Sequence, residues 1–215
     1  MISVLVVDDH DLVRSGISRL LTDAKGVQVA GEASSGEEAI QHVKEQEPDV
    51  ILMDIQMPGI GGLEATRKIK RQHPEVQVIA VSACDDNPFA QRLLQAGASG
   101  YITKGAGCEE MVAAIVKVFS GQKYISQEIA QRMALKPFEP EQENLFDKLS
   151  DREMQIALMI VNCHRAAEIG DKLFLSPKTV NSYRYRIFDK LGIDGDVELT
   201  RLAIRNGVID PSSGN

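Results

Sequence analysis

Four short apolar runs of the chain end in polar residues that could do chemistry, namely Asp8 with Asp9, then Asp54, Ser82 and Lys104. Short apolar runs that alternate with helical patterns are typical of buried parallel strands. An open parallel sheet presents the carboxyl ends of its strands at one edge, where ligands bind. We therefore expect these five side chains to share one cleft that suits a hard cation and a phosphoryl group.

Three carboxylates in one cleft repel one another, which raises the pKa of at least one of them. A Mg²⁺ ion would relieve the repulsion, because it binds one or two carboxylates together with water and phosphate oxygens. Beside such an ion, Asp54 could act as a nucleophile and accept a phosphoryl group. Lys104 would pair with one phosphoryl oxygen and Ser82 would donate a hydrogen bond to another. The added negative charge would draw the loop that carries Ser82 inward.

The elements that would position these residues are five strands near residues 2–7, 27–33, 50–54, 76–82 and 100–103. Helical patterns lie between the strands, which predicts an α/β, doubly wound domain with a five-stranded parallel sheet over residues 1–121. Residues 122–146 are predicted to be a linker that begins with an amphipathic helix near 126–135 and continues as a polar stretch with two prolines.

Residues 147–211 show helical patterns only, which predicts a second, smaller all-α domain. Ser150 with Glu153 predicts a capping box at the start of its first long helix. Ser176 followed by Pro177 predicts an N-cap and the first position of another helix. The remaining helices are predicted at about 166–174, 177–191 and 196–206.

The two predicted domains differ in their balance of charged residues. Residues 1–144 contain 14 Lys and Arg against 21 Asp and Glu, whereas residues 145–215 contain 10 of each. Residues 177–191 form a local basic stripe, which indicates contact with an anion. A short helix, a turn and this basic helix make a helix-turn-helix, whose second helix would enter the major groove of double-stranded DNA. The predicted DNA contacts are Lys178, Thr179, Asn181, Ser182, Arg184, Tyr185, Arg186 and Lys190.

Other features of the chain indicate its location and the state of its cysteine and histidine side chains. No apolar stretch is long enough to span a bilayer and the chain begins directly with a strand, so a cytoplasmic location is expected. Cys84, Cys108 and Cys163 are widely spaced without a C-x-x-C arrangement, which favours reduced thiols over a metal or redox site. His10 neighbours the acidic pair, and we expect an exposed helix-start residue there rather than a ligand.

Taken together and in order, the cleft residues resemble the receiver domain of two-component response regulators, which has a flavodoxin-like fold. The resemblance rests on Asp8-Asp9, Asp54 within Leu-Met-Asp-Ile-Gln-Met-Pro-Gly, Ser82, and Tyr101 three residues before Lys104. It implies a Mg²⁺ ion held by Asp9, Asp54 and the backbone carbonyl of Gln56, with Asp8 close by. It also implies a sensor histidine kinase as phosphoryl donor and a switch in which Tyr101 swings inward when Ser82 moves. Receivers often have proline after the lysine, and Gly105 stands there in this chain, so the isomer of that peptide bond stays open.

The second domain resembles the LuxR-type DNA-binding module, through residues 149–153, 167–175 and Ser-Pro-Lys-Thr-Val-Asn at 176–181. With the receiver, the chain resembles the NarL/FixJ class of response regulators over nearly its whole length, and within that class the GacA/UvrY/VarA group. This resemblance implies base contacts mainly at Asn181, Ser182 and Tyr185. It also implies a homodimer in the phosphorylated or DNA-bound state, a hybrid-type sensor kinase, and promoters of small regulatory RNA genes as targets.

Departures from the LuxR-type pattern concern the first helix of the pair. Cys163 and Arg165 stand where the family usually has glycine and a serine cap, and Gly170 lies within the helix. Loss of the cap costs about 1 kcal/mol and a glycine within the helix costs about the same again, so this helix is expected to be less stable than usual.

Two other functions are compatible with parts of the sequence. Asp9-x-Asp11 after a strand also resembles the nucleophile motif of haloacid-dehalogenase-type phosphatases, with Asp11 as general acid and the second domain as a substrate cap. A constitutive DNA-binding protein with an inactive receiver is the third possibility. For the last helix, Leu199, Leu202 and Ala203 are predicted to form a dimer seam, and core packing is their competing role.

Overall fold

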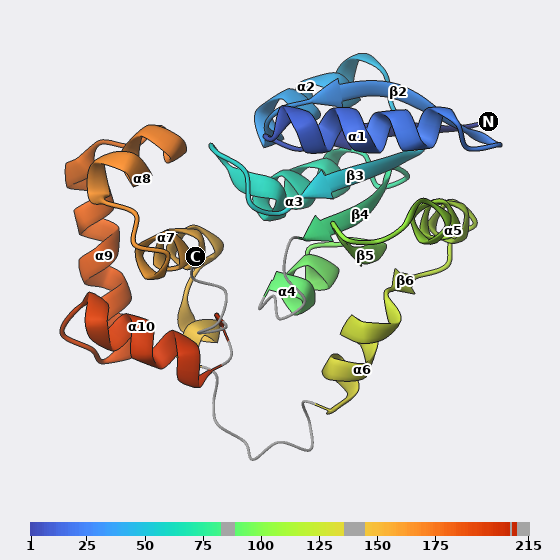
Figure 1. Cartoon of the computed structure of the whole chain (residues 1–215). Helices are drawn as coiled ribbons and strands as arrows, with labels where there is room; N and C mark the ends of the chain where they lie inside the picture. Colours follow the sequence, from blue (N-terminus) through green and yellow to red (C-terminus); the bar gives the residue numbers. More distant parts are fainter. Residues whose placement is uncertain (83–88, 136–144, 207, 210–215) are drawn as a thin grey trace. The chain divides into compact units, whose positions relative to one another are not determined.

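The structure is a computed structural model that describes residues 1–82, 89–135, 145–206 and 208–209 (Figure 1). The chain divides into two compact units, with the main boundary between residues 136 and 137. Within the described residues, no helix has both the length and the apolar character that a membrane span requires.

The first unit is built on one parallel sheet. Its strands are β1 (Ile2–Val7), β2 (Val27–Ala33), β3 (Val50–Asp54), β4 (Gln77–Ser82), β5 (Gly100–Thr103) and β6 (Tyr124–Ile125). They are arranged in the order β2-β1-β3-β4-β5-β6, and every neighbouring pair is parallel. The first five strands stand in the flavodoxin-like order, which confirms the predicted doubly wound fold.

The sixth strand corrects the predicted five-stranded sheet. The amide of Tyr124 donates to Ser99 and the amide of Ser126 donates to the carbonyl of Tyr101, at 3.1 and 3.0 Å. These residues lie in the segment that was predicted to be the linker. A strand of two residues is too short to give a recognisable alternation of polar and apolar side chains.

The helices of this unit are α1 (Asp11–Thr22), α2 (Gly36–Glu45), α3 (Gly61–Gln72), α4 (Phe89–Gln95), α5 (Cys108–Phe119) and α6 (Gln127–Leu135). Both faces of the sheet are covered by helices. Buried residues of α1 and α5 pack with Val4 and Val6 in one core. Those of α2 and α3 pack with Leu5 and Val7 in the other. Successive residues of β1 are therefore buried on opposite faces, which explains the unbroken apolar run in the sequence.

The second unit contains a short 3₁₀ helix, η2 (Leu145–Lys148), and four helices, α7 (Asp151–Val161), α8 (Ala166–Leu173), α9 (Pro177–Leu191) and α10 (Asp196–Arg205). The predicted capping box is present at the start of α7, with Ser150 and Glu153 as its members. Ser176 caps α9, whose first residue is Pro177, as predicted. The all-α character of this unit is confirmed over the described residues.

The apolar side chains of α10 decide between the two roles that the sequence left open. Leu199, Leu202 and Ala203 are buried within the second unit. They form part of its core and cannot supply the predicted dimer seam. The exposed apolar residues of α10 are instead Val197 and Ile204, which stand seven residues apart on one face.

Candidate functional site

The carboxyl ends of the central strands bring the predicted cleft residues to one edge of the sheet. Asp8 directly follows β1, Asp54 and Ser82 are the last residues of β3 and β4, and Lys104 directly follows β5. The side chains of Asp8, Asp54 and Ser82 are almost completely buried. Burial of two carboxylates so close together demands a positive partner, because an unpaired buried charge is strongly destabilising.

Lys104 supplies that positive charge. Its Nζ lies 2.9 Å from Oδ2 of Asp54 and 2.7 Å from Oδ2 of Asp8. Its backbone amide donates to the carbonyl of Ser82 at 2.6 Å, which ties the end of β4 to the lysine. Partial burial disfavours the charged ammonium, but the bonds to Asp54 and Asp8 outweigh this effect and raise the pKa of Lys104. The peptide bond between Lys104 and Gly105 is trans.

Burial perturbs the carboxyl group of Asp54. Burial raises its pKa from 3.8 to about 6, although the bond from Lys104 acts in the opposite direction. The negative charge of Asp8 raises it further, as expected for like charges in one site. The backbone amide of Gln56 donates to Oδ1 of Asp54 at 3.2 Å and so holds the carboxylate from the other side.

Close packing of α3 against the end of β3 also positions Asp54. A Cβ atom on Gly62 would lie 2.0 Å from the backbone oxygen of Asp54. The amide of Gly62 donates to the carbonyl of Ile55 at 3.1 Å. Only glycine therefore fits at position 62, and the run Gly61-Gly62 in the sequence was the signal for this positioning residue.

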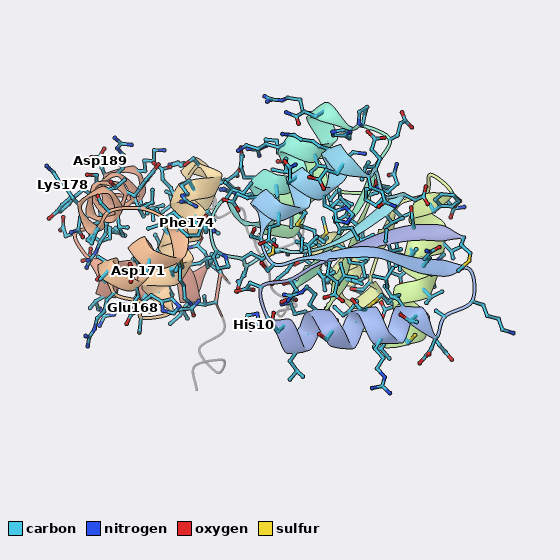
Figure 2. The ribbon with its side chains drawn as sticks, turned by 90° about the horizontal axis from the view of Figure 1, so that it is seen from above. His10, Glu168, Asp171, Phe174, Lys178 and Asp189 are labelled. Carbon is cyan, nitrogen blue, oxygen red and sulfur yellow. The ribbon has the colours of Figure 1, made fainter. Side chains whose placement is uncertain are left out.

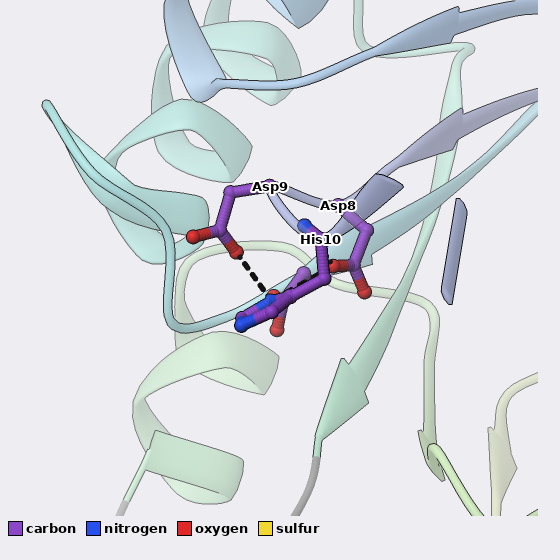
Figure 3. A group of neighbouring side chains, drawn as sticks. Asp8, Asp9 and His10 are labelled. Atoms are coloured by element: carbon purple, nitrogen blue, oxygen red, sulfur yellow. Dashed lines mark hydrogen bonds and ion pairs between the residues drawn. The ribbon is translucent and has the colours of Figure 1, made fainter. Parts of the chain in front are cut away.

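The side chain of His10 contacts both members of the acidic pair. Its Nδ1 lies 3.0 Å from Oδ1 of Asp9 and 3.4 Å from Oδ1 of Asp8 (Figure 3). One donor atom from each of Asp8, Asp9, His10 and Asp54 can be chosen so that all four lie within 4.8 Å of one another. His10 is an exposed helix-start residue, as expected, but its ring nitrogen also joins the acidic cluster.

The donor set fits Mg²⁺. Three carboxylates with oxygens this close offer the hard ligands that Mg²⁺ prefers, and water would complete its octahedron. The raised pKa of Asp54 is the mark of crowded, buried negative charge that a divalent cation would relieve.

The two switch residues that the resemblance predicted are both enclosed. Ser82 is buried at the end of β4, and Tyr101 on β5 has no exposed surface. Residues Ala80 and Tyr101 are partners in the pairing of β4 with β5, and Ser82 pairs with Thr103 two residues further along. Tyr101 therefore lies in the inward position, on the strand next to the one that carries Ser82.

The surface of α9 carries the predicted DNA contacts. The residues Val180, Ile187 and Leu191 face the core of the second unit. Lys178, Ser182, Tyr185 and Arg186 are exposed, with Tyr185 at 72 %. Thr179 and Asn181 are half-buried. The side chains of Lys178 and Asp189 project outward from this helix (Figure 2).

Two basic residues of α9 already have carboxylate partners within the second unit. Arg184 donates from Nε to Asp196 at the start of α10, at 2.8 Å, and its second nitrogen also contacts that carboxylate. Lys190 donates to Glu153 on α7 at 2.6 Å. Sequence spacing placed these residues beside the outer face of α9 but gave no sign of their partners on other helices.

Residues with a strained backbone lie before and after α8. Cys163, after α7, and Phe174, after α8, adopt the left-handed conformation at φ 62° and 54°. A Cβ on Gly170 would lie 2.6 Å from the carbonyl oxygen of Leu175, so the tight turn requires glycine there. Phe174 is also 77 % exposed, and a bulky side chain in the left-handed conformation is a backbone outlier.

The chain matches known proteins over both units. Residues 4–116 match the response regulator receiver domain, and residues 147–203 match the bacterial regulatory proteins of the luxR family. The chain is 61 % identical over 214 residues to response regulator GacA of Pseudomonas aeruginosa, with 99 % of this chain and 100 % of that protein covered. It is 56 % identical over 209 residues to response regulator UvrY of Escherichia coli, with 97 % and 96 % covered.

Solved structures agree with these matches. A two-component response regulator of the LuxR family from an Aurantimonas species aligns with a TM-score of 0.61 and 36 % identity, over 64 % of this chain and 98 % of that one. Response regulator ChrA of a haem-sensing two-component system aligns with a TM-score of 0.55 and 29 % identity, over 97 % and 98 %.

The phosphatase alternative finds no support in these matches or in the geometry. Its general acid, Asp11, is 88 % exposed and pairs with Arg14 instead of facing the cleft. The matched families cover both units and account for both the acidic cleft and the basic helix. The chain therefore belongs to the two-component response regulators that join a receiver domain to a LuxR-type DNA-binding domain.

Proposed function

We propose that a sensor histidine kinase phosphorylates Asp54 and that this modification controls sequence-specific DNA binding by α9. The observation that carries the proposal is the placement of Asp54 between Lys104, at 2.9 Å, and the acidic pair at the edge of the sheet. A histidine kinase partner and DNA binding follow from the two domain types.

The phosphoryl transfer follows from the groups at this edge. An oxygen of Asp54 forms a bond to phosphorus while the bond from phosphorus to the kinase histidine breaks. Lys104 then moves from the carboxylate to a phosphoryl oxygen, and the hydroxyl of Ser82 donates to another. Asp8, Asp9, Asp54 and the backbone carbonyl of Gln56 would hold Mg²⁺, which would neutralise charge on the phosphoryl oxygens. The chain's own chemistry is limited to this transfer and the slow hydrolysis of phospho-Asp54.

Charge and hydrogen bonding couple this site to the switch. The phosphoryl group adds roughly −1.5 to −2 charge and three acceptors. A Ser82 hydroxyl held by it would pull the end of β4 inward, and the buried position of Tyr101 would then be favoured. We propose Ser82 and Tyr101 as the residues that carry the signal away from Asp54.

On DNA, the residues of α9 would make two kinds of contact. Lys178 and Arg186 would contact phosphates, while Asn181, Ser182 and Tyr185 would contact base edges, with Thr179 beside them at the start of the helix. Arg184 and Lys190 remain predicted contacts, and their present carboxylate partners give them a second role in holding α9 against α10 and α7.

We further propose a homodimer on two half-sites one helical turn apart. The exposed apolar residues of α10, Val197 and Ile204, are the best candidates for its contact within the second unit. We assign residues 1–121 to the receiver, 122–146 to the linker and 147–211 to the DNA-binding domain. The strand β6 lies within the first residues of this proposed linker and pairs with β5.

The resemblance to the GacA/UvrY/VarA group supports two finer proposals, a hybrid-type kinase and small regulatory RNA genes as targets. We also propose a cytoplasmic location. A DNA-selection assay with the full chain, run with and without acetyl phosphate and Mg²⁺, tests the proposed function. We expect one enriched motif of two half-sites, bound more tightly after phosphorylation. Equal binding under both conditions would favour the constitutive DNA-binding alternative, and no enriched motif would refute sequence-specific binding.

A further inference from the structure

We propose that Arg14 is a positioning residue for the phosphorylation site, because its guanidinium sets the orientation of the peptide unit that joins Asp8 and Asp9. The inference rests on the proposed function, in which both aspartates hold Mg²⁺. Arg14 lies outside the acidic cluster, in the first turn of α1, and acts through the backbone of Asp8.

The guanidinium of Arg14 binds three separate elements of the receiver. Its Nη1 donates to the backbone carbonyl of Asp8, which directly follows β1, at 2.7 Å. Its Nε donates to the carboxylate of Glu32 on β2 at 3.2 Å, and its Nη2 pairs with Asp11 at the start of α1. The side chain of Arg14 is only 14 % exposed. One rigid, planar fork therefore connects the end of β1, the neighbouring strand and the start of α1.

The bond to the carbonyl of Asp8 acts on two metal ligands at once. A peptide unit is planar, so the carbonyl of Asp8 and the amide of Asp9 lie in one plane. Arg14 thereby fixes the plane from whose two ends the carboxylates of Asp8 and Asp9 extend (Figure 3). The preceding peptide unit is held by the bond from the amide of Asp8 to the carbonyl of Ala33 on β2, at 3.1 Å. The strand β2 therefore holds Asp8 on both sides, directly at its amide and through Glu32 and Arg14 at its carbonyl.

Asp9 is the ligand that depends most on this backbone support. Its side chain is 24 % exposed, whereas those of Asp8 and Asp54 are 2 % exposed and are held by the surrounding core. Mg²⁺ demands a nearly ideal octahedron with short bonds to oxygen. A peptide unit that could rotate would place Asp9 poorly and lower the affinity for the ion.

Charge and position predict opposite effects when Arg14 is replaced. If Arg14 acted only through its charge, Arg14→Gln would remove a cation near three carboxylates and strengthen Mg²⁺ binding. If Arg14 positions the peptide, the same variant binds Mg²⁺ more weakly. Arg14→Lys separates the two roles further, because lysine keeps the charge but lacks the planar fork that reaches three partners.

The experiment compares Mg²⁺ binding by the full chain, freed of metals, in the wild type, Arg14→Gln and Arg14→Lys. Amide shifts in nuclear magnetic resonance spectra give the dissociation constant. We expect both variants to bind Mg²⁺ about tenfold more weakly, at the lower end of the losses seen when an outer partner of a metal ligand is removed. With acetyl phosphate as donor, the half-maximal rate of phosphorylation should require more Mg²⁺, while the rate at saturating Mg²⁺ stays close to that of the wild type.

The matched control is Arg19→Gln, because Arg19 is exposed on the same helix. It should keep the wild-type dissociation constant. Unchanged or tighter Mg²⁺ binding in Arg14→Gln, or wild-type binding in Arg14→Lys, would overturn the inference, and urea unfolding of the same variants would then report a structural role alone. The proposed function fails separately, if a wild-type chain that binds Mg²⁺ gains no phosphoryl group on Asp54.

Discussion

Lys190 on α9 and Glu153 on α7 are joined by a hydrogen bond of 2.6 Å, and the carboxylate is almost fully buried. Burial alone would raise the pKa of Glu153. The contact with Lys190 and the amide of Ser150 outweigh burial and lower it. Lys190, which the sequence predicts to be a DNA contact, therefore also pairs with a buried carboxylate of the second unit.

Lys190→Ala should lower the free energy of unfolding by about 1–3 kcal/mol, because it leaves a buried carboxylate without its charged partner. The pKa of Glu153 is lowered in the folded state, so this stabilisation is present above the ordinary pKa of glutamate and is lost as pH falls through the lowered value. Urea unfolding at neutral pH should show the full effect, and unfolding in acid a smaller one.

Lys178→Ala is the matched control, because Lys178 lies exposed in the first turn of the same helix. It should change the free energy of unfolding by less than about 0.5 kcal/mol and reduce the salt slope of DNA binding by about 1. Equal stability of the two variants would contradict the structural role of Lys190.

Asn181→Ala and Arg186→Ala should affect DNA binding differently. Loss of a base contact at Asn181 should relax the preference at one base pair by about 1–3 kcal/mol. Loss of a phosphate contact at Arg186 should weaken binding on all sequences and flatten its salt dependence. Titration of operator and mutated-operator DNA at several salt concentrations measures both. If both variants lose affinity equally on every sequence, the base-reading assignment is wrong.

Asp54→Asn should stabilise the metal-free receiver in a pH-dependent way. The pKa of Asp54 is raised from 3.8 to about 6, and each unit corresponds to about 1.4 kcal/mol, so the ionised carboxylate costs up to about 3 kcal/mol. Between these two pH values the folded chain binds more protons than the unfolded chain, and stability therefore falls as pH rises. The advantage of the variant should grow from pH 4 to pH 7 in EDTA, as followed by circular dichroism. A constant difference would show that the pKa of Asp54 is not raised.

Phe174→Gly should stabilise the second unit by about 1 kcal/mol, because glycine adopts the left-handed conformation without the steric penalty of a side chain. Little packing is lost with a ring that is 77 % exposed. Thermal unfolding measures the gain. Phe174→Ala removes the same ring but keeps the strain, so it should show no such gain, and an equal gain in both variants would locate the effect in the ring.

Four strands and their polar ends could be predicted from the sequence, because β1, β3, β4 and β5 are mostly buried and each leads into a functional residue. The convergence of Asp8, Asp54 and Lys104 then follows from the geometry of a parallel sheet alone. The structure confirms that these three side chains lie together.

The contacts that sequence reasoning missed depend on tertiary packing. Lys190 and Glu153 are 37 residues apart, and no helical periodicity relates two different helices. The ring of His10 lies beside the carboxylates of Asp8 and Asp9, and residue types alone do not reveal this contact. The turn that contains Phe174 likewise brings the carbonyl oxygen of Leu175 close to Gly170, five residues earlier in the chain.

Phosphoryl incorporation into the full chain tests the central claim most directly. The wild type and Asp54→Asn are incubated with a phosphorylated histidine kinase domain or with acetyl phosphate, in Mg²⁺ and in EDTA, and the intact mass of each is measured. The account predicts one acid-stable, base-labile phosphoryl group on the wild type in Mg²⁺, and none on the variant or in EDTA. Incorporation into Asp54→Asn at the wild-type level would show that a different residue accepts the phosphoryl group.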